Sequence, residues 1–231
     1  MYRSLNPAAI VETIDQLRAR IEERFPGSGL SKVAAELQLI GQQAVQRSAW
    51  IGQPQWALRV GIAVLVMLLL VTLASAIAPL HLSAKLQSWV EFVQGFESGI
   101  NAILLIGAAI FFLFTIEARI KRHRALKALH ELRALAHIID MHQLTKDPER
   151  VGNNGPSTKS SPKRVMTDFE LTRYLDYCSE MLSLTGKIAA LYVQGFDDPV
   201  VLSAVDQIED LTTSLSRKIW QKITIIDENL S

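Results

Sequence analysis

The chain has few of the features that mark enzymes and nucleic-acid-binding proteins. Its 231 residues include one cysteine, Cys178, which excludes an intrachain disulfide and favours a reducing compartment. The 24 basic and 23 acidic residues give a net charge of +1, so no global field attracts nucleic acid. A glycine-rich phosphate loop, a nucleophile elbow and a CxxC pair are all missing. We therefore expect no enzymatic activity, no cofactor and no nucleic-acid partner.

Two long uncharged runs dominate what is present. Residues 60–78 read VGIAVLVMLLLVTLASAIA, and residues 98–116 read SGINAILLIGAAIFFLFTI. A helix over either run would span roughly 28 Å, close to the hydrocarbon core of about 30 Å. A soluble chain this short offers too little surrounding structure to bury two such helices. The sequence therefore predicts an all-α integral membrane protein with a two-span helical hairpin, its helices at 57–79 and 98–116.

Basic residues lie mainly on one side of these spans. Two precede the first span and six follow the second, whereas the connecting segment 80–97 contains Lys85 alone. The eight are Arg47, Arg59, Arg119, Lys121, Arg122, Arg124, Lys127 and Arg133. The positive-inside rule then places both termini in the cytoplasm and residues 80–97 outside, as in a multi-pass protein of the inner (plasma) membrane. Apolar residues at helical spacing in 80–97 predict a short helix in the outer interface.

The segments outside the spans predict a cytoplasmic helical bundle. Residues 1–50 show two amphipathic stripes separated by Pro26-Gly27-Ser28-Gly29, which predict two N-terminal helices. The helical pattern of the second span continues without a breaker through 117–147, and Pro148 ends this extension. Residues 148–166 are rich in Gly, Ser, Asn and Pro, and they predict a flexible linker.

Residues 167–231 carry the clearest pattern of soluble structure. Thr167 and Glu170 match a capping box, and apolar residues then alternate at spacings of four and three up to Tyr192. Asp198-Pro199 starts a second run with the same rhythm, so the segment predicts an antiparallel hairpin of coiled-coil type. Its apolar surface is wider than a two-helix seam needs. We expect it to pack on the N-terminal helices, on the extension after the second span, or on another subunit.

Small and polar residues in the spans form one group of candidate functional residues. Asn101 is the one strongly polar side chain there, and polar groups in lipid seek protein partners. The group consists of Gly99, Asn101 and Gly107 in the second span and Thr72 and Ser75 in the first. Helix packing in a homo-oligomer is the simpler interpretation. A pore lining is the alternative, with no ionisable residue inside either span to select ions.

A second group is the basic cluster directly after the second span. Its members are Arg119, Lys121, Arg122 and Arg124, and we expect them to meet anionic lipid. A specific lipid or nucleotide site at this cluster is the alternative. His130 and His137 share a helix face, but no metal-binding motif surrounds them and we expect no metal site. Cys178 occupies a heptad core position, which predicts inert packing.

These patterns together favour a non-enzymatic membrane protein whose cytoplasmic helices mediate self-assembly or partner docking, with the C-terminal hairpin as a docking element. The alternative is an oligomeric channel or a membrane-disrupting effector lined by the second span. In layout alone, the chain resembles small two-span effectors of bacterial defence systems, which act by membrane disruption. It also invites comparison with CorA-type magnesium channels. However, their Gly-Met-Asn signature is replaced here by Ser75-Ala76-Ile77-Ala78-Pro79.

Overall fold

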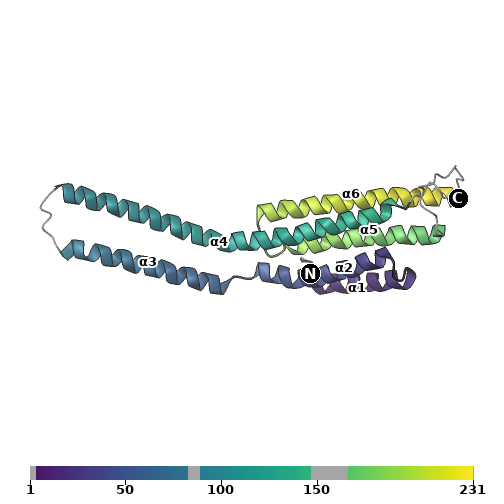
Figure 1. The fold of residues 1–231 in the computed structure, drawn as a ribbon, viewed down its shortest axis with the longest axis horizontal. Coiled ribbons are helices and arrows are strands. Elements are labelled where there is room, and N and C mark those ends of the chain that lie inside the picture. Colours follow the sequence, from purple (N-terminus) through teal and green to yellow (C-terminus); the bar gives the residue numbers. More distant parts are fainter. Residues whose placement is uncertain (1–3, 83–88, 147–165, 231) are drawn as a thin grey trace. The chain divides into compact units, whose positions relative to one another are not determined.

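The computed structural model describes residues 4–82, 89–146 and 166–230, and all regular structure within these ranges is helical. This confirms the predicted all-α class. The helices are α1 (Pro7–Arg24), α2 (Gly29–Gly52), α3 (Trp56–Leu82), α4 (Trp89–Leu144), α5 (Asp168–Leu191) and α6 (Pro199–Leu230), drawn in Figure 1. The predicted linker at 148–166 lies outside the described residues except for Met166, and residues 83–88 of the connecting segment also lie outside them.

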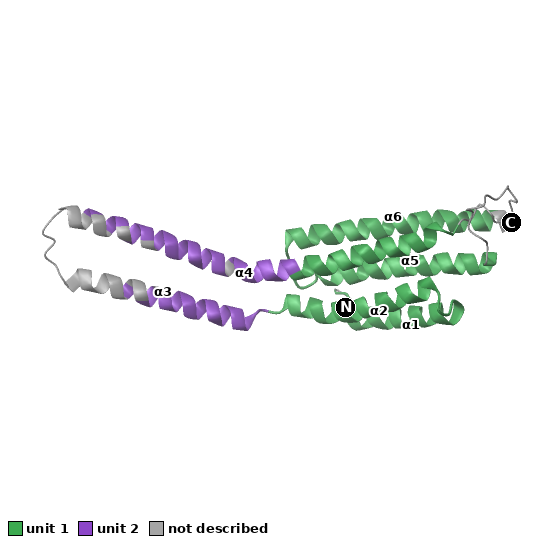
Figure 2. Ribbon diagram, in the orientation of Figure 1, with its two compact units in different colours: residues 1–53, 124–231 green, residues 54–123 purple. Residues whose placement is uncertain are grey.

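The chain divides into two compact units, coloured separately in Figure 2. The first, which we call the helical bundle, comprises residues 1–53 and 124–231. It contains α1, α2, the last part of α4, α5 and α6. The second, which we call the apolar unit, comprises residues 54–123 and contains α3 and the first part of α4. Both expected spans lie in the apolar unit, which also includes residues 117–123 of the expected extension.

Local sequence determines where the helices of the bundle begin. Thr167 and Glu170 form the predicted capping box, in which the Glu170 carboxylate accepts the Thr167 backbone N–H at 2.8 Å. The Asp198 carboxylate accepts the backbone N–H groups of Val200 and Val201 at 3.1 and 3.2 Å, which starts α6 after a short turn. The corresponding side chains at the starts of α1 and α2 are those of Asn6 and Ser28. Helices α5 and α6 thus follow each other across a short turn and pack together, where the sequence predicts a hairpin.

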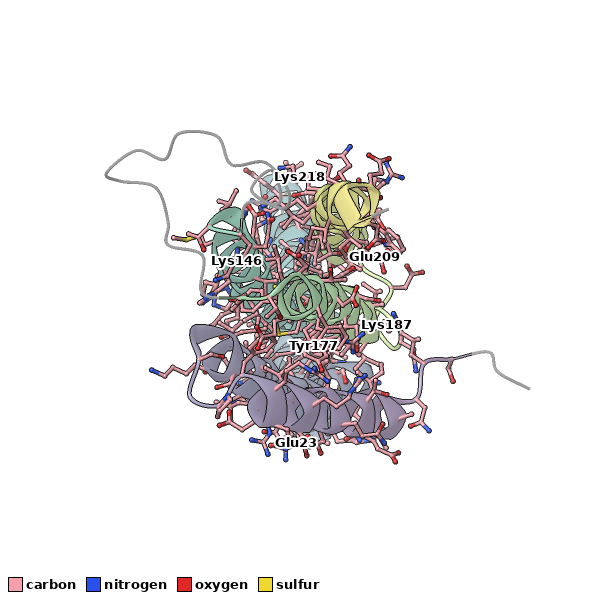
Figure 3. The ribbon with its side chains drawn as sticks, turned by 90° about the vertical axis from the view of Figure 1, so that its right-hand side faces the viewer. Glu23, Lys146, Tyr177, Lys187, Glu209 and Lys218 are labelled. Carbon is pink, nitrogen blue, oxygen red and sulfur yellow. The ribbon has the colours of Figure 1, made fainter. Side chains whose placement is uncertain are left out.

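Helix α5 lies at the centre of the bundle. Figure 3 shows it between α4 and α6 on one side and α1 and α2 on the other. More than half of its residues are buried, and the ring of Phe25 packs edge-on against those of Tyr174 and Tyr177, with centroids 5.4 and 6.3 Å apart. On α6, Lys222 donates to the backbone carbonyl of Gln143 in α4 at 2.8 Å. The wide apolar surface of the hairpin therefore packs on the N-terminal helices and on the extension of the same chain.

Two positions show how tightly this core is packed. A side-chain carbon placed on Gly41 of α2 would lie 2.8 Å from Cδ1 of Ile14 and 3.7 Å from Cδ1 of Ile188, so the absence of a side chain lets α2 approach α1 and α5. Cys178 is fully buried, as its heptad position predicts. Burial raises the pKa of its thiol to about 12, and the group is therefore neutral at physiological pH.

The boundaries of the long helices differ from the predicted ones. Helix α3 continues through Pro79 to Leu82, because a proline in the last turn removes few helical hydrogen bonds. Helix α4 begins at Trp89, so residues 89–97 form its first turns and are not a separate interfacial helix. The apolar spacing of 89–97 is that of any helix, and no proline separates it from the second span. At its other end α4 stops at Leu144, three residues before the predicted end.

The packing of α5 predicts how the bundle behaves after a cut in the chain. We expect limited proteolysis of the solubilised protein to cut within 151–164, as the composition there predicts. The α5–α6 fragment should then stay bound to the rest, since its buried surface lies against α1, α2 and α4. Size-exclusion chromatography and then denaturing electrophoresis would show both fragments in one peak.

Gly41→Leu provides the matched test, because a large side chain there forces α2 away from α5. We expect this variant to release the fragment after cleavage. Leu39→Ala, at a position 49% exposed on the same helix, should not. Release of the fragment from the cleaved parent protein would contradict the packing described here.

Candidate functional site

The apolar unit leaves most of its large apolar side chains exposed. Leu104, Leu105 and Phe111 of α4 are 65, 72 and 72% exposed, and Val64 and Met67 of α3 are 61 and 66% exposed. Two helical stretches, within Gly29–Leu68 and Gly99–Leu144, are long and apolar enough to cross a membrane by length and composition. Only 6% and 0% of their most apolar windows are buried, whereas the core helix of a soluble protein would be mostly buried.

Three of the five predicted packing residues can be placed. Asn101 is exposed on α4. A side-chain carbon placed on Gly99 or Gly107 meets no atom of the described chain within 4 Å. These residues therefore form no close helix contact within the described part of the molecule. Thr72 and Ser75 lie on α3, but their side chains are outside what the structure describes. The roles of all five stay predictions.

A cluster of ionic hydrogen bonds joins α3 to α4 beside the ends of the two uncharged runs, 60–78 and 98–116. The Glu117 carboxylate accepts from Nε of Arg59 at 2.9 Å, from Nζ of Lys121 at 3.0 Å and from the backbone N–H of Gln55 at 3.3 Å. The Glu117 side chain is 14% exposed. The bond from Arg59, reinforced by the other donors, lowers the pKa of Glu117 from 4.5 to about 2. The carboxylate is therefore ionised at any physiological pH.

This cluster includes one predicted residue, Lys121, and adds another, Glu117. Lys121, expected to meet anionic lipid, is only 7% exposed and shares the Glu117 carboxylate with Arg59. Its contact with anionic lipid stays a prediction. Glu117 was not among the residues predicted from the sequence. A signal for it was present, because Glu117 is the first charge after a 19-residue uncharged run and precedes Lys121 by four residues.

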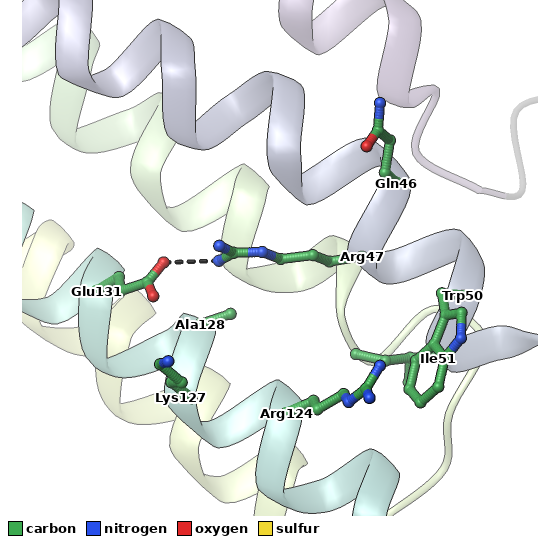
Figure 4. A pocket seen from close by; sticks show the side chains of 8 residues that line it. All are labelled: Gln46, Arg47, Trp50, Ile51, Arg124, Lys127, Ala128 and Glu131. Carbon is green, nitrogen blue, oxygen red and sulfur yellow. Dashed lines mark hydrogen bonds and ion pairs between the residues drawn. The ribbon is translucent and has the colours of Figure 1, made fainter.

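A pocket of about 410 Å³ lies between α2 and α4 within the bundle (Figure 4). It is lined by one acidic, three basic, one amide and three apolar side chains. These are Glu131, then Arg47, Arg124 and Lys127, then Gln46, and finally Trp50, Ile51 and Ala128. The pocket combines an apolar wall with a lining charge of +2.

The three cations of the pocket differ in how their charges are balanced. Arg47 donates to the Glu131 carboxylate at 2.6 Å and so closes the pocket across α2 and α4. The guanidinium of Arg124 lies over the Trp50 ring, 4.1 Å from its centroid. Arg124 and Lys127 are exposed, and neither forms an ion pair with a residue of the described chain. Two cationic groups therefore remain available beside an aromatic surface.

The other predicted basic residues and the histidines lie elsewhere. Arg119 lies over the Phe112 ring at 5.8 Å, and Arg122 is half-buried. His130 and His137 are exposed on α4, and among the described residues no group of three or more His, Cys, Asp or Glu side chains is arranged to hold a metal. Of the basic cluster predicted to meet anionic lipid, Arg124 alone lines the pocket.

Comparisons with known proteins found no match for this chain among family models, curated proteins or solved structures. Its function is therefore argued from its own residues.

The Glu117 cluster predicts a stability effect that can be separated from simple loss of a charge. Glu117→Gln leaves the buried Lys121 ammonium without this carboxylate and weakens the link to Arg59, at a cost of about 2 kcal/mol in unfolding free energy. Glu117→Gln combined with Lys121→Met should recover most of the loss, since both buried charges are gone. Chemical unfolding in detergent, monitored by circular dichroism, measures both. Glu97→Gln, at an exposed acid of the same helix, serves as the control.

The pH dependence of this effect has a definite sign. Because the folded pKa of Glu117 lies below its ordinary value of 4.5, its contribution is complete above pH 4.5 and disappears as the pH falls through about 2. The difference in unfolding free energy between the parent protein and Glu117→Gln should therefore fall to zero as the pH drops from 4.5 to about 2. If Glu117→Gln alone and Glu117→Gln with Lys121→Met lost the same unfolding free energy, the result would contradict coupling between Glu117 and Lys121.

Proposed function

We propose that this chain is a two-span membrane protein of the inner (plasma) membrane that self-assembles, with its helical bundle in the cytoplasm. The observation that carries the proposal is the exposure of the apolar unit, where 6% and 0% of the two most apolar windows are buried. In water such a surface promotes aggregation, whereas in a bilayer it lies in its preferred solvent. A helix satisfies its own backbone groups there.

The distribution of basic residues supports the orientation. Eight basic residues adjoin the outer ends of the two runs, and Lys85 alone lies between them. Such an excess is typical of cytoplasmic flanks. The ionic cluster around Glu117 adds a second argument, because its three charged groups belong in the polar layer next to a span and not within it. Both ends of the chain are then cytoplasmic.

The surface of α4 supports self-assembly within the bilayer. A buried amide without a hydrogen-bond partner costs a few kcal/mol in hydrocarbon, and Asn101 is exposed on this helix. Gly99 and Gly107 are open, and small residues let a second helix backbone come close. At 3.6 residues per turn, Asn101 lies about 160° around the helix from Gly99. Helix α4 therefore has two distinct faces to offer neighbouring subunits.

The bundle contributes a docking surface of smaller extent than its heptads suggest. Most of the apolar seam of α5 and α6 is buried within the chain. On α6, Leu202 and Trp220 are 18 residues apart, which places them on one side of the helix, and they remain 45 and 63% exposed. We retain this face of the C-terminal hairpin as the proposed contact for a partner protein or a second subunit.

An oligomeric channel is the second candidate, and the position of Asn101 favours it. If Gly99 and Gly107 pack against a neighbouring subunit, Asn101 lies on a different side of α4 and faces the centre of a ring. An amide there would be hydrated instead of unpaired. The same arrangement would serve a membrane-disrupting effector. No enzymatic activity is part of either proposal.

Membrane insertion and self-assembly are tested separately. We expect the protein to stay in the membrane pellet after alkaline carbonate extraction, because two apolar spans hold it there. Sedimentation equilibrium in density-matched detergent should give a mass above that of one chain. Gly107→Leu should shift the mass toward the monomer, and Leu105→Met, a volume-conserving change at an exposed neighbour, should not. Release by carbonate would refute the spans, and a strict monomer would refute self-assembly.

The channel is tested by current recordings across planar bilayers that contain the purified protein. We expect discrete conductance steps in the parent, and Asn101→Leu should reduce or abolish them because a hydrated amide is replaced by an apolar group. Leu105→Met is again the control. Silence across voltages and ions, or unchanged currents in Asn101→Leu, would exclude a pore lined by α4 and leave the assembly proposal intact.

A further inference from the structure

We propose that the pocket between α2 and α4 binds the phosphate group of an anionic membrane lipid, held by Arg124 and Lys127 against Trp50. This inference rests on the proposed membrane location and names a ligand for the cytoplasmic side. The basic and aromatic side chains drawn in Figure 4 line one cavity, which has a volume of about 410 Å³.

The charges of the pocket fit a phosphate. The Arg47–Glu131 pair at 2.6 Å is balanced, so it forms a neutral end wall. Arg124 and Lys127, three residues apart on α4, lie on the same side of that helix and form no ion pair with the described chain. A guanidinium fork and a mobile ammonium together suit the several oxygens of a phosphate group.

The apolar wall indicates that the ligand is amphiphilic. Trp50, Ile51 and Ala128 line the cavity beside the two cations. An inorganic anion would use the charges and gain nothing from this wall. A lipid headgroup with its glycerol and first acyl carbons would use both, and tryptophan is common at the depth where such groups meet protein.

The position of the pocket along α4 points to the membrane surface. Arg124 follows Ile116 by eight residues of one continuous helix, a rise of about 12 Å. Side chains in a helix lean toward its N-terminal end, which for this part of α4 is the direction of the span. Arg124 and Lys127 thus follow the second uncharged run by 8 and 11 residues of the same helix, about three turns or less. Trp50 precedes the first uncharged run by only ten residues.

The experiment uses the full-length protein in a neutral detergent and three water-soluble probes. These are short-chain phosphatidic acid, phosphatidylcholine with the same chains, and ATP. Titration calorimetry should show binding of phosphatidic acid well above that of phosphatidylcholine and ATP. Arg124→Gln and Lys127→Gln should each weaken it about fivefold, as expected for one lost cation at a lipid surface. Trp50→Ala should weaken binding of the lipid through loss of the apolar wall.

Lys218→Gln is the matched control, since it removes one exposed positive charge from α6, which contributes no residue to the pocket lining. Equal weakening in this control would mean that net charge alone attracts the probe, and it would overturn the site. Tighter binding of ATP than of phosphatidic acid, unaffected by Trp50→Ala, would identify a soluble phosphate and overturn the lipid. Equal binding of both lipids in parent and pocket variants would also overturn it.

The short-chain probes keep this test independent of membrane insertion. If carbonate releases the protein while the pocket variants still lose phosphatidic acid, the proposed membrane location fails and the phosphate pocket stands. If the protein resists extraction but shows no preference for phosphatidic acid, the membrane location stands and the pocket inference fails.

Discussion

One helix, α4, runs without a break from the apolar unit into the helical bundle and contributes residues to both. Its first part exposes Leu104, Leu105 and Phe111, whereas its last part buries Leu129, Leu132 and Ile139. The same backbone hydrogen bonds serve both parts, because a helix needs no partner for its main chain in either solvent. The side-chain pattern changes instead, from apolar on all sides to apolar on one stripe.

The side-chain pattern of α4 changes at Glu117. The negative charge of this largely buried carboxylate is stabilised by Arg59, Lys121 and the backbone N–H of Gln55, which all donate hydrogen bonds to it. Arg59 comes from α3, so the acid links the two helices where each leaves its uncharged run. A buried pair of this kind adds little net stability compared with apolar residues, but loss of one member is costly. Its contact across the two helices links α3 to α4 at one position along each helix.

Sequence reasoning succeeded where structure is local. The caps at Thr167 and Asp198, the hairpin turn and the uncharged runs are set by residues within a few positions of one another, and periodicity identifies the buried stripe of α5. It failed where contacts are distant in the chain. Glu117 meets Arg59 from 58 positions away, and Trp50 meets Arg124 from 74. Neither separation follows from the repeat of a helix, so the sequence pattern cannot pair these residues. Only the folded chain shows which basic residue meets which partner.

The basic residues after the second run differ in their surroundings. Counted in sequence, Lys121 and Arg124 are equivalent members of one topology signal. In the structure Lys121 is buried and shares the Glu117 carboxylate with Arg59, while Arg124 lies over the half-buried ring of Trp50 without an ion-pair partner in the described chain. The proposed anion site therefore depends on Arg124 and Lys127, which form no ion pair in the described chain, and not on the number of basic residues in the cluster. In that proposal the apolar wall, and not the charge alone, discriminates among anions.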